Sequence, residues 1–252
     1  MIEEGLFKEF PVDAVYGLHN WPFLEVGKVA TRKGPLMASA DEIIISIRGK
    51  GGHAAMPHKT VDPVVVAAHI VTALQSIVAR NVDPIDQGVI TIANFNAGTG
   101  AHNIIADTAK LGGTIRAFRH ETREFMHKRV KEITENVAKA FMAEAEVHIS
   151  DGYDPTINSD AETDFAARAA AAIVGEQNVD TNTPPCMGAE DFGAYLTKRP
   201  GAFIFVGQGV SSDPKSRHNQ GLHTPRYDFN DEIIPIGVSW FAKLVEQHMP
   251  IE

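Results

Sequence analysis

The fold of the central part of the chain is decided by the stretch Glu42-Ile-Ile-Ile-Ser-Ile-Arg48, which is followed by Gly49-Lys-Gly-Gly52. Polar and apolar residues alternate in the first segment, which predicts a β-strand that ends at the flexible glycine-rich segment. Residues 61–80 come next and are rich in Val and Ala. Asp62 can cap a helix there and Pro63 suits its first turn, so the unit opens with a strand and a helix.

The same unit continues to about residue 151. Strands are predicted near 88–96 and 109–118, a charged amphipathic helix at about 121–143, and a closing strand at 146–150. The order strand-helix-strand-strand-helix-strand is typical of the split ferredoxin-like pattern. The sequence therefore predicts one domain of this type over residues 38–151.

The rest of the chain, 1–37 with 152–252, alternates helices with apolar strands and predicts an α/β layer architecture. The predicted strands lie at 11–18 and 202–206, and the predicted helices at 160–174, 189–197 and 231–248. Because this domain is interrupted by residues 38–151, we expect one domain set inside another. A length of 252 residues suits two domains.

Composition excludes several classes of protein. Lys and Arg number 23 against 32 Asp and Glu, a net charge of −9 that disfavours a nucleic-acid partner. No apolar run approaches the ~18 residues of a membrane span, so no membrane partner is expected. The single cysteine, Cys186, excludes internal disulfides, which makes a reducing compartment such as the cytoplasm the default location.

Two histidines lie where open α/β sheets place ligands. His19 ends a predicted strand, and His223 precedes the helix that opens at 230–232. Each follows Gly-Leu and can offer one ring nitrogen to a metal while a neighbour fixes the tautomer. The alternative is that both are hydrogen-bonding surface histidines, and the two imidazoles alone are too few for a catalytic site.

A second group of candidate residues lies in the inserted domain. His53 is presented from a glycine-flanked loop, where the backbone permits close approach to a ligand. Asn103 and Arg116 can together hold a carboxylate, or be a loop amide and a surface cation. In the surrounding domain, Glu190 is a candidate metal ligand within Met187-Gly-Ala-Glu-Asp-Phe192, and its alternative role is helix capping or compensation of a helix dipole.

These motifs occur together in an order that resembles the amidohydrolase branch of the M20 metallopeptidase family, which includes hippurate hydrolases. The segments that carry the resemblance are Gly17-Leu-His-Asn-Trp-Pro22, Gly49-Lys-Gly-Gly-His-Ala-Ala-Met-Pro-His58, Asn103-Ile-Ile-Ala-Asp107, Gly113-Thr-Ile-Arg116, Met187-Gly-Ala-Glu-Asp-Phe192 and Leu222-His-Thr-Pro-Arg-Tyr-Asp-Phe-Asn-Asp231. They are spread over essentially the whole chain.

The resemblance implies a metal-dependent hydrolase of N-acyl amino acids whose catalytic α/β domain is interrupted by a ferredoxin-like lid or dimerisation domain. It implies that His19 and His223 are ligands of a two-metal site holding Zn, Mn, Co or Ni. It also implies that His53 reaches the reacting carbonyl oxygen from the partner's lid in a homodimer. Asn103 and Arg116 would anchor the substrate carboxylate, and Glu190 would be part of the active-site wall.

The sequence departs from the family in one respect. The family's Cys-Gly-His-Asp-Gly-His segment and its later Glu-Glu pair, which supply further ligands and the general base, have no counterpart; Glu3-Glu4 belongs to the helix after that pair. We therefore expect the chain to correspond to the C-terminal two thirds of the enzyme and to be inactive alone. The alternatives are a non-catalytic carboxylate-binding or dimerisation protein, or a separate chain that supplies the missing part.

Overall fold

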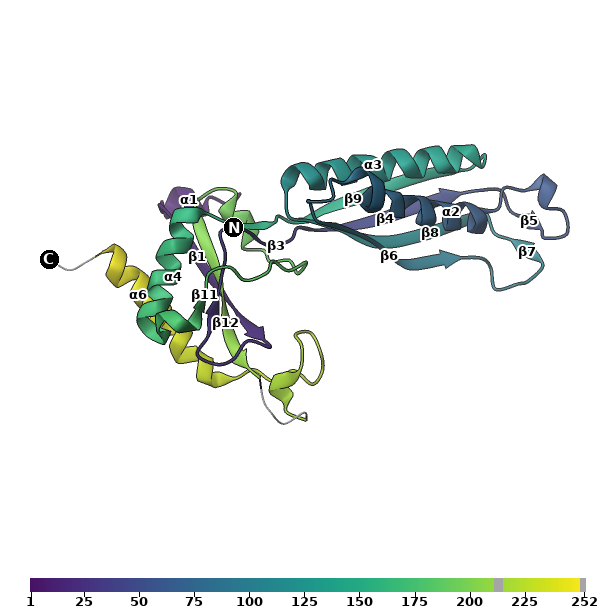
Figure 1. Ribbon diagram of the computed structural model, residues 1–252. Helices are drawn as coiled ribbons and strands as arrows, with labels where there is room; N and C mark the ends of the chain where they lie inside the picture. Colours follow the sequence, from purple (N-terminus) through teal and green to yellow (C-terminus); the bar gives the residue numbers. More distant parts are fainter. Residues whose placement is uncertain (211–214, 250–252) are drawn as a thin grey trace. The chain divides into compact units, whose positions relative to one another are not determined.

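The computed structural model describes residues 1–210 and 215–249 and divides the chain into two compact units (Figure 1). The first unit contains Met1–Met37, Thr156–Cys186 and Asp191–Glu252. The second contains Ala38–Pro155 together with Met187–Glu190. One unit is therefore inserted into the other along the chain.

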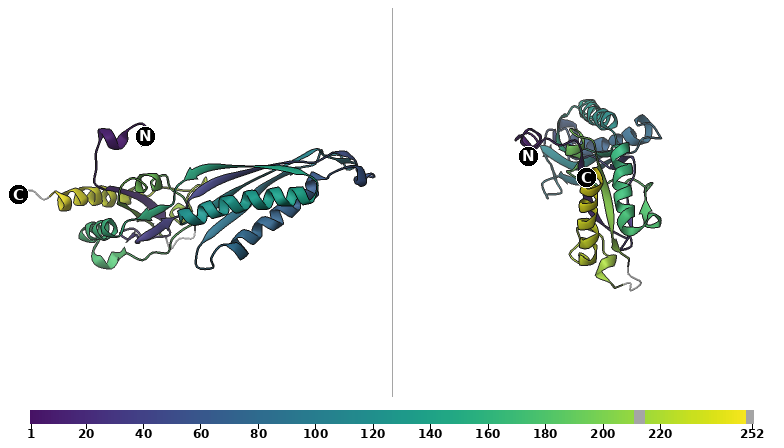
Figure 2. Two further views of the ribbon diagram at one scale, coloured as in Figure 1. Left: turned by 90° about the horizontal axis from the view of Figure 1, so that it is seen from above. Right: turned by 90° about the vertical axis from the view of Figure 1, so that its left-hand side faces the viewer.

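The second unit is built on a four-stranded antiparallel sheet in the order β6-β8-β4-β9. Its strands are β4 (Ala40–Arg48), β6 (Gly88–Ala97), β8 (Thr108–Ala117) and β9 (Glu144–Tyr153). Helix α2 (Pro63–Ser76), continued by the π-helical turn η2 (Ile77–Asn81), and helix α3 (His120–Ala140) cover one face (Figure 2). This order of elements and of strands is the ferredoxin-like topology.

The alternation in β4 explains which face of this sheet is covered. Ile43, Ile45 and Ile47 are at most 1% exposed and lie in one apolar core with residues of both helices, whereas Glu42 and Ser46 point to the open face. A sheet with one packed face and one solvated face is typical of antiparallel strands. The core of the second unit thus lies between this face of the sheet and α2 and α3.

Two short elements of the second unit were not expected from the sequence. β5 (Gly52–His53) and β7 (Ile104–Ile105) form a two-stranded antiparallel ribbon, and the 3-10 turn η1 (Pro57–Lys59) follows β5. Gly51 is required next to this ribbon, because a Cβ atom there would lie 2.7 Å from the carbonyl oxygen of Ile105. The close approach of the two backbones fixes the glycine-rich segment.

The first unit contains a mixed sheet in the order β1-β12-β2-β11. The strands are β1 (Val15–Pro22), β2 (Val29–Ala30), β11 (Val179–Asp180) and β12 (Gly201–Gly209); β1 is parallel to β12, and β12 is antiparallel to β2. The helices are α1 (Leu6–Glu9), α4 (Asp160–Val174), α5 (Gly193–Leu196) and α6 (Ile234–His248), and the 3-10 turns are η3 (Glu176–Asn178), η4 (Arg217–Asn219) and η5 (Asp231–Ile233).

Strand β12 is the centre of this unit, because both of its faces are buried. Ala202, Ile204 and Val206 pack with residues of α4 and α6, whereas Phe203 and Phe205 belong to a second apolar cluster on the other face. A continuous apolar run is the sequence signature of a strand covered on both sides. This core positions the carboxyl end of β12, where the candidate site begins.

The second unit is inserted at a short antiparallel ladder of the first. β3 (Gly34–Met37) pairs with β10 (Thr156–Asn158), and Met37 lies opposite Thr156. The chain therefore leaves the first unit and returns to it at directly paired residues.

The units differ from the predicted boundaries in two places. β9 continues to Tyr153, so residues 152–155 belong to the second unit rather than to the first. The helix predicted at 189–197 is confined to α5, because Met187–Glu190 joins the second unit, where Gly188 O accepts a hydrogen bond from Ala38 N at 2.9 Å. Both differences result from tertiary contacts that the local sequence does not encode.

One helix corrects the statement that no apolar run approaches membrane-span length. Among the described residues, Pro63–Asn81 is long and apolar enough to cross a membrane by length and composition, with a mean hydropathy of 1.5. Its inward face, which includes Val66, Ile70 and Leu74, completes the core of the second unit. Packing against the sheet accounts for the apolar residues of this face, whereas Val64, Val65 and Val78 are exposed.

Candidate active site

His19 lies near the carboxyl end of β1, in register with Phe205 of the parallel strand β12. Its Nδ1 is 2.6 Å from the carbonyl oxygen of Asn20. Because a carbonyl oxygen only accepts hydrogen bonds, Nδ1 is the donor, and in the neutral ring Nε2 carries the lone pair. Metal-binding histidines are commonly oriented by such a bond from their other ring nitrogen.

Three side chains form a polar cluster beside His19. Gln208, at the carboxyl end of β12, is fully buried, and its Oε1 accepts hydrogen bonds from Asn20 Nδ2 at 2.7 Å and from the hydroxyl of Tyr227. Asn20 Nδ2 also donates to the Tyr227 hydroxyl. Sequence reasoning missed this cluster, because Asn20 and Gln208 are 188 positions apart.

His223 belongs to the loop that this cluster holds. The loop turns tightly, since Thr224 Oγ1 donates to Gly221 O and Tyr227 N donates to Thr224 O, each at 3.1 Å. His223 itself is exposed and has a φ of 60°, in the left-handed region that non-glycine residues rarely adopt. Such a conformation costs on the order of 1 kcal/mol or more and persists where the surroundings impose it.

An apolar cavity of about 330 Å³ adjoins the same end of β1. Leu18, His19 and Val206 line it from the sheet, and Phe229 and Phe241 line it from α6 and the segment before it. His19 therefore lies at the edge of an apolar cavity.

In the second unit, the structure brings His53 and Asn103 together on the β5–β7 ribbon. His53 is paired with Ile104, and Ala54 N donates to Asn103 O at 2.9 Å. The Nδ1 of His53 accepts a hydrogen bond from Ala55 N at 3.1 Å, so the ring proton of the neutral imidazole is on Nε2. His53 is an exposed residue, and its Nε2–H group is the hydrogen-bond donor that the ring offers.

Arg116 does not lie with Asn103 in one chain. It is near the far end of β8, eight residues after Thr108, which corresponds to roughly 26 Å of extended strand. The guanidinium donates from a terminal nitrogen to Met187 O at 3.0 Å. The expected carboxylate site formed by Asn103 and Arg116 is therefore not assembled within a single chain.

Glu190 is half-buried and lies outside helix α5, in the short segment that joins the second unit. The helix expected at 189–197 begins only at Gly193, so Glu190 precedes it rather than lying in its first turn. The segment is attached to the second unit by Arg116 at Met187 and by Ala38 at Gly188.

A buried ionic cluster of the second unit was missed from the sequence. The carboxylate of Asp41 accepts hydrogen bonds from Arg123 through Nε at 2.8 Å and Nη2 at 2.5 Å, from His127 Nε2 at 2.8 Å and from Gly152 N at 3.1 Å. Arg123 also contacts Asp154 at 2.9 Å. Burial raises the pKa of Asp41, but these hydrogen bonds and the charge of Arg123 outweigh it and hold that pKa well below its usual range.

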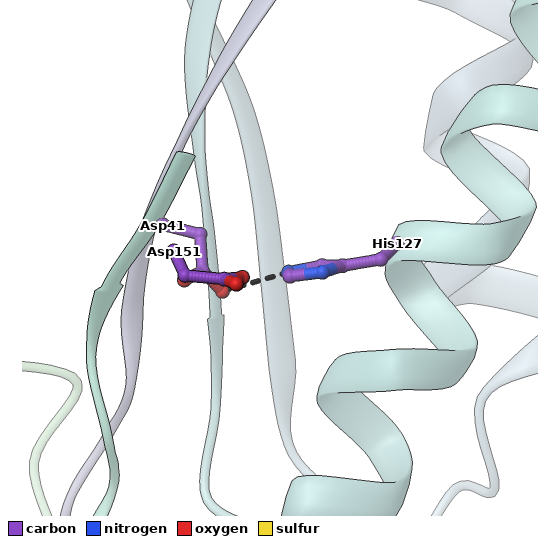
Figure 3. Close-up of side chains that lie close together, drawn as sticks. All are labelled: Asp41, His127 and Asp151. Carbon is purple, nitrogen blue, oxygen red and sulfur yellow. Dashed lines mark hydrogen bonds and ion pairs between the residues drawn. The ribbon is translucent and has the colours of Figure 1, made fainter. Parts of the chain in front are cut away.

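Figure 3 shows the His127 imidazole directed at the Asp41 carboxylate, with Asp151 beside it. Ligand atoms of these three residues lie within 4.8 Å of one another, a spacing that suits a metal ion. Asp41, however, already accepts two hydrogen bonds from the guanidinium of Arg123, whose positive charge would repel a cation. We therefore assign the cluster to ion pairing that joins β4, β9 and α3.

Comparison with known proteins identifies the family. The model of peptidase family M20/M25/M40 matches residues 1–247, so the chain belongs to this family, as the motifs predicted. The chain is 37% identical over 249 residues to a hippurate hydrolase of Campylobacter jejuni, covering 99% of this chain and 63% of that protein. It is 36% identical to an N-acetylcysteine deacetylase of Bacillus subtilis, covering 92% of this chain and 58% of the relative.

The fold is shared with solved structures of the family. The YXEP protein of Bacillus subtilis, described as a dinuclear metal binding peptidase from the M20 family, superposes with a TM-score of 0.78 at 28% identity. The match covers 98% of this chain and 60% of that one. The predicted mixed α/β fold is therefore confirmed, and the chain spans about 60% of the length of the relatives it matches.

Proposed function

We propose that the chain forms part of a metal-dependent hydrolase that cleaves the amide bond of N-acyl amino acids. The observation that carries the proposal is the geometry of His19, whose Nδ1–H is donated to a backbone carbonyl at the carboxyl end of parallel strands. The names of the relatives, a hippurate hydrolase and an N-acetylcysteine deacetylase, support this class of substrate. A cytoplasmic location stays a prediction from the cysteine content.

His19 and His223 are the proposed metal ligands. Imidazoles suit Zn, Mn, Co and Ni, and the tautomer of His19 places a lone pair on Nε2. Two imidazoles are fewer than the three or four protein ligands of a typical zinc site, so we place the remaining ligands and the general base in the part of the relatives that this chain does not match. A divalent metal held there would supply Lewis acidity for activating a water molecule and polarising the substrate carbonyl.

The residues of the second unit have proposed roles in substrate binding. The Nε2–H of His53 is a neutral donor suited to an oxygen on which negative charge develops. Arg116 anchors the free carboxylate of the substrate, because one guanidinium edge can bind it while another nitrogen holds Met187. Asn103 supports the same anchor, and Glu190 forms part of the wall.

A homodimer would resolve the separation of Asn103 from Arg116. Roughly 26 Å of strand divides them within one chain, so an anchor that uses both requires the ribbon of a second copy. His53 would arrive from the partner on the same ribbon, since its neighbour Ala54 is hydrogen-bonded to Asn103. We propose that this contact is made through the second unit, acting as a lid and dimerisation domain.

The proposal is tested with two proteins, the 252-residue chain and a fusion that places the unmatched segment of the Campylobacter hippurate hydrolase before Met1. We expect the fusion to release glycine from hippurate with added Zn, Mn or Co, and to lose this activity with a chelator and in His19→Ala. We expect the chain alone to show neither turnover nor tight binding of two metal ions by calorimetry.

Turnover by the chain alone, with two tightly bound metals, would contradict the assignment of further ligands to the unmatched segment. A folded fusion that hydrolyses hippurate equally well with and without His19 would contradict the metal role of His19. Size-exclusion chromatography with light scattering tests the dimer in the same samples.

A second candidate is a non-catalytic carboxylate-binding or dimerisation protein. It is favoured by the completeness of the second unit, which holds His53, Asn103 and Arg116 on its own sheet and ribbon. Saturable binding of hippurate that is lost in Arg116→Ala and unaffected by a chelator would support it. Chelator-sensitive turnover by the chain itself would exclude it.

A further inference from the structure

We propose that Gln208 is a positioning residue that holds His19 and the His223 loop in the geometry required to share a metal. This inference rests on the proposed function, because it concerns the same two histidines. It adds a residue that touches neither metal nor substrate and acts through Asn20 and Tyr227.

Gln208 is placed to carry such a role by its burial and by the direction of its hydrogen bonds. Its side chain is fully buried, its Oε1 accepts from Asn20 and from Tyr227, and its Nε2 donates to Asp228 O at 2.9 Å. The backbone oxygen of Gln208 accepts from Asn230 Nδ2 at 2.9 Å. A buried side-chain amide whose oxygen and nitrogen both make hydrogen bonds holds its partners in one arrangement.

The hydrogen bond between Gln208 and Asn20 connects Gln208 to His19. Gln208 fixes the side chain of Asn20, and the carbonyl oxygen of the same Asn20 accepts the Nδ1–H of His19. The orientation of the His19 ring therefore depends on the position of Asn20. Loss of the Gln208 amide would release the Asn20 side chain and loosen the irregular end of β1, whose Asn20 carbonyl orients the imidazole, so we expect the ring to rotate or to change tautomer.

The hydrogen bonds between Gln208 and the segment after His223 connect Gln208 to that histidine. Tyr227 and Asp228 are bound by Gln208 and follow His223 by four and five residues; Tyr227 closes the turn that begins at Thr224, and Asp228 follows this turn. The left-handed backbone of His223 needs surroundings that impose it, and this attachment supplies them. A single side chain thus links the strand that carries one proposed ligand to the loop that carries the other.

The chain offers a matched control for a purely structural role. Asn158 is also a buried amide of the first unit, and its side chain contacts Phe203 near the amino end of β12, where its Oδ1 accepts from Phe203 N at 2.8 Å and its Nδ2 donates to Phe203 O at 3.0 Å. Gln208→Met and Asn158→Leu each remove a buried amide of similar connectivity. Both are expected to lower the free energy of unfolding, and only the first is expected to disturb the histidines.

Two measurements on the full 252-residue chain separate these roles. The tautomer of His19 is read from ¹⁵N NMR of histidine-labelled protein, with its signals assigned by His19→Gln. Cobalt(II) binding is followed by calorimetry, and the component lost in His19→Ala defines binding at this site. We expect Gln208→Met to give a mixed His19 tautomer and to weaken cobalt binding by about 10–100-fold, the range seen when residues supporting metal ligands are removed. Asn158→Leu should leave both unchanged.

Gln208→Glu provides a second variant if Gln208→Met does not fold. The carboxylate still accepts from Asn20 and Tyr227 but cannot donate to Asp228 O, so the His19 tautomer should persist while cobalt binding weakens. A wild-type tautomer and cobalt affinity within twofold in either variant that folds would overturn the inference. Cobalt binding could be unchanged in His19→Ala while the His19 tautomer changes when Gln208 is substituted. This outcome would contradict the metal site of the proposed function and would still support the positioning of His19 by Gln208.

Discussion

Asp41 and Arg123 join three elements of the second unit through side chains that are almost completely buried. Asp41 is the second residue of β4, Arg123 comes from α3, Gly152 lies near the end of β9, and Asp154 follows that strand. The Arg123 side chain is 11% exposed and that of Asp41 is fully buried. Removing one partner of such a pair leaves a buried charge without compensation, which costs more than the pair itself contributes.

We predict that Arg123→Met lowers the free energy of unfolding by about 3–5 kcal/mol at neutral pH, because Asp41 remains buried without its guanidinium. Urea denaturation followed by circular dichroism measures this loss. Arg129→Met is the matched control in the same helix; its guanidinium lies 2.5 Å from Glu132 in a more exposed pair and should cost about 1 kcal/mol or less. Equal losses of unfolding free energy in the two variants would show that the Asp41 cluster stabilises the protein no more than the exposed ion pair does.

Individual site residues could be predicted from the sequence where they belong to a local motif. His19, His53 and Arg116 were singled out by their strand-end or glycine-flanked positions. Asp41 and Arg123 are 82 positions apart, and no spacing in the sequence marks them as partners. Long-range hydrogen bonds between ordinary polar residues therefore escaped prediction.

At the scale of the element, β8 contains two adjacent glycines with opposite surroundings. A Cβ atom at Gly112 would lie on the open face, 3.5 Å from Asn94 Cβ, which is an ordinary contact. A Cβ atom at Gly113 would lie 2.1 Å from Thr91 O of the neighbouring strand β6. Thr91 O belongs to the ladder between β6 and β8, and its backbone cannot move aside without disturbing that pairing.

We predict that Gly113→Ala destabilises the protein by about 1–3 kcal/mol or more, as an overpacked position does. Gly112→Ala should be neutral or stabilise by up to about 1 kcal/mol, because alanine has less freedom than glycine in the unfolded chain. Thermal unfolding of the two variants side by side checks both values. A larger loss in Gly112→Ala than in Gly113→Ala would contradict the described register of β6 and β8.

Long elements with a clear pattern were predicted well, and short ones were not. β4 follows its alternation, and α2 starts at Asp62, whose side chain accepts from Val64 N at 2.9 Å. β5 and β7 have two residues each and exist only because they pair with each other. Their formation depends on a contact across some fifty positions, which periodicity cannot reveal.

At the scale of the whole molecule, each unit has apolar clusters of its own. The core of the second unit is drawn entirely from residues between Ile43 and Ile149, and the two clusters of the first unit use none of these residues. A unit with its own core can in principle fold alone. The segment Met187–Glu190 is attached to the second unit by hydrogen bonds at Ala38 and Arg116.

We predict that residues 38–155 expressed alone fold cooperatively, because the sheet, both helices and the Asp41 cluster lie within them. Urea denaturation should give one transition, and Arg123→Met should destabilise this fragment by the same amount as the full chain. A fragment that unfolds without a cooperative transition would show that the core depends on the first unit or on Met187–Glu190.

The pairing of Met37 with Thr156 has a consequence for the order in which the molecule folds. The entropy cost of closing a chain segment grows with its length, and here β3 and β10 are separated by the whole inserted unit. Once the inserted unit has folded, its two ends are held close and the ladder can form like that of a hairpin. We therefore expect the inserted unit to fold first and the host sheet to be completed around it, so slow folding of the insert would delay the strand ends that carry His19 and Gln208.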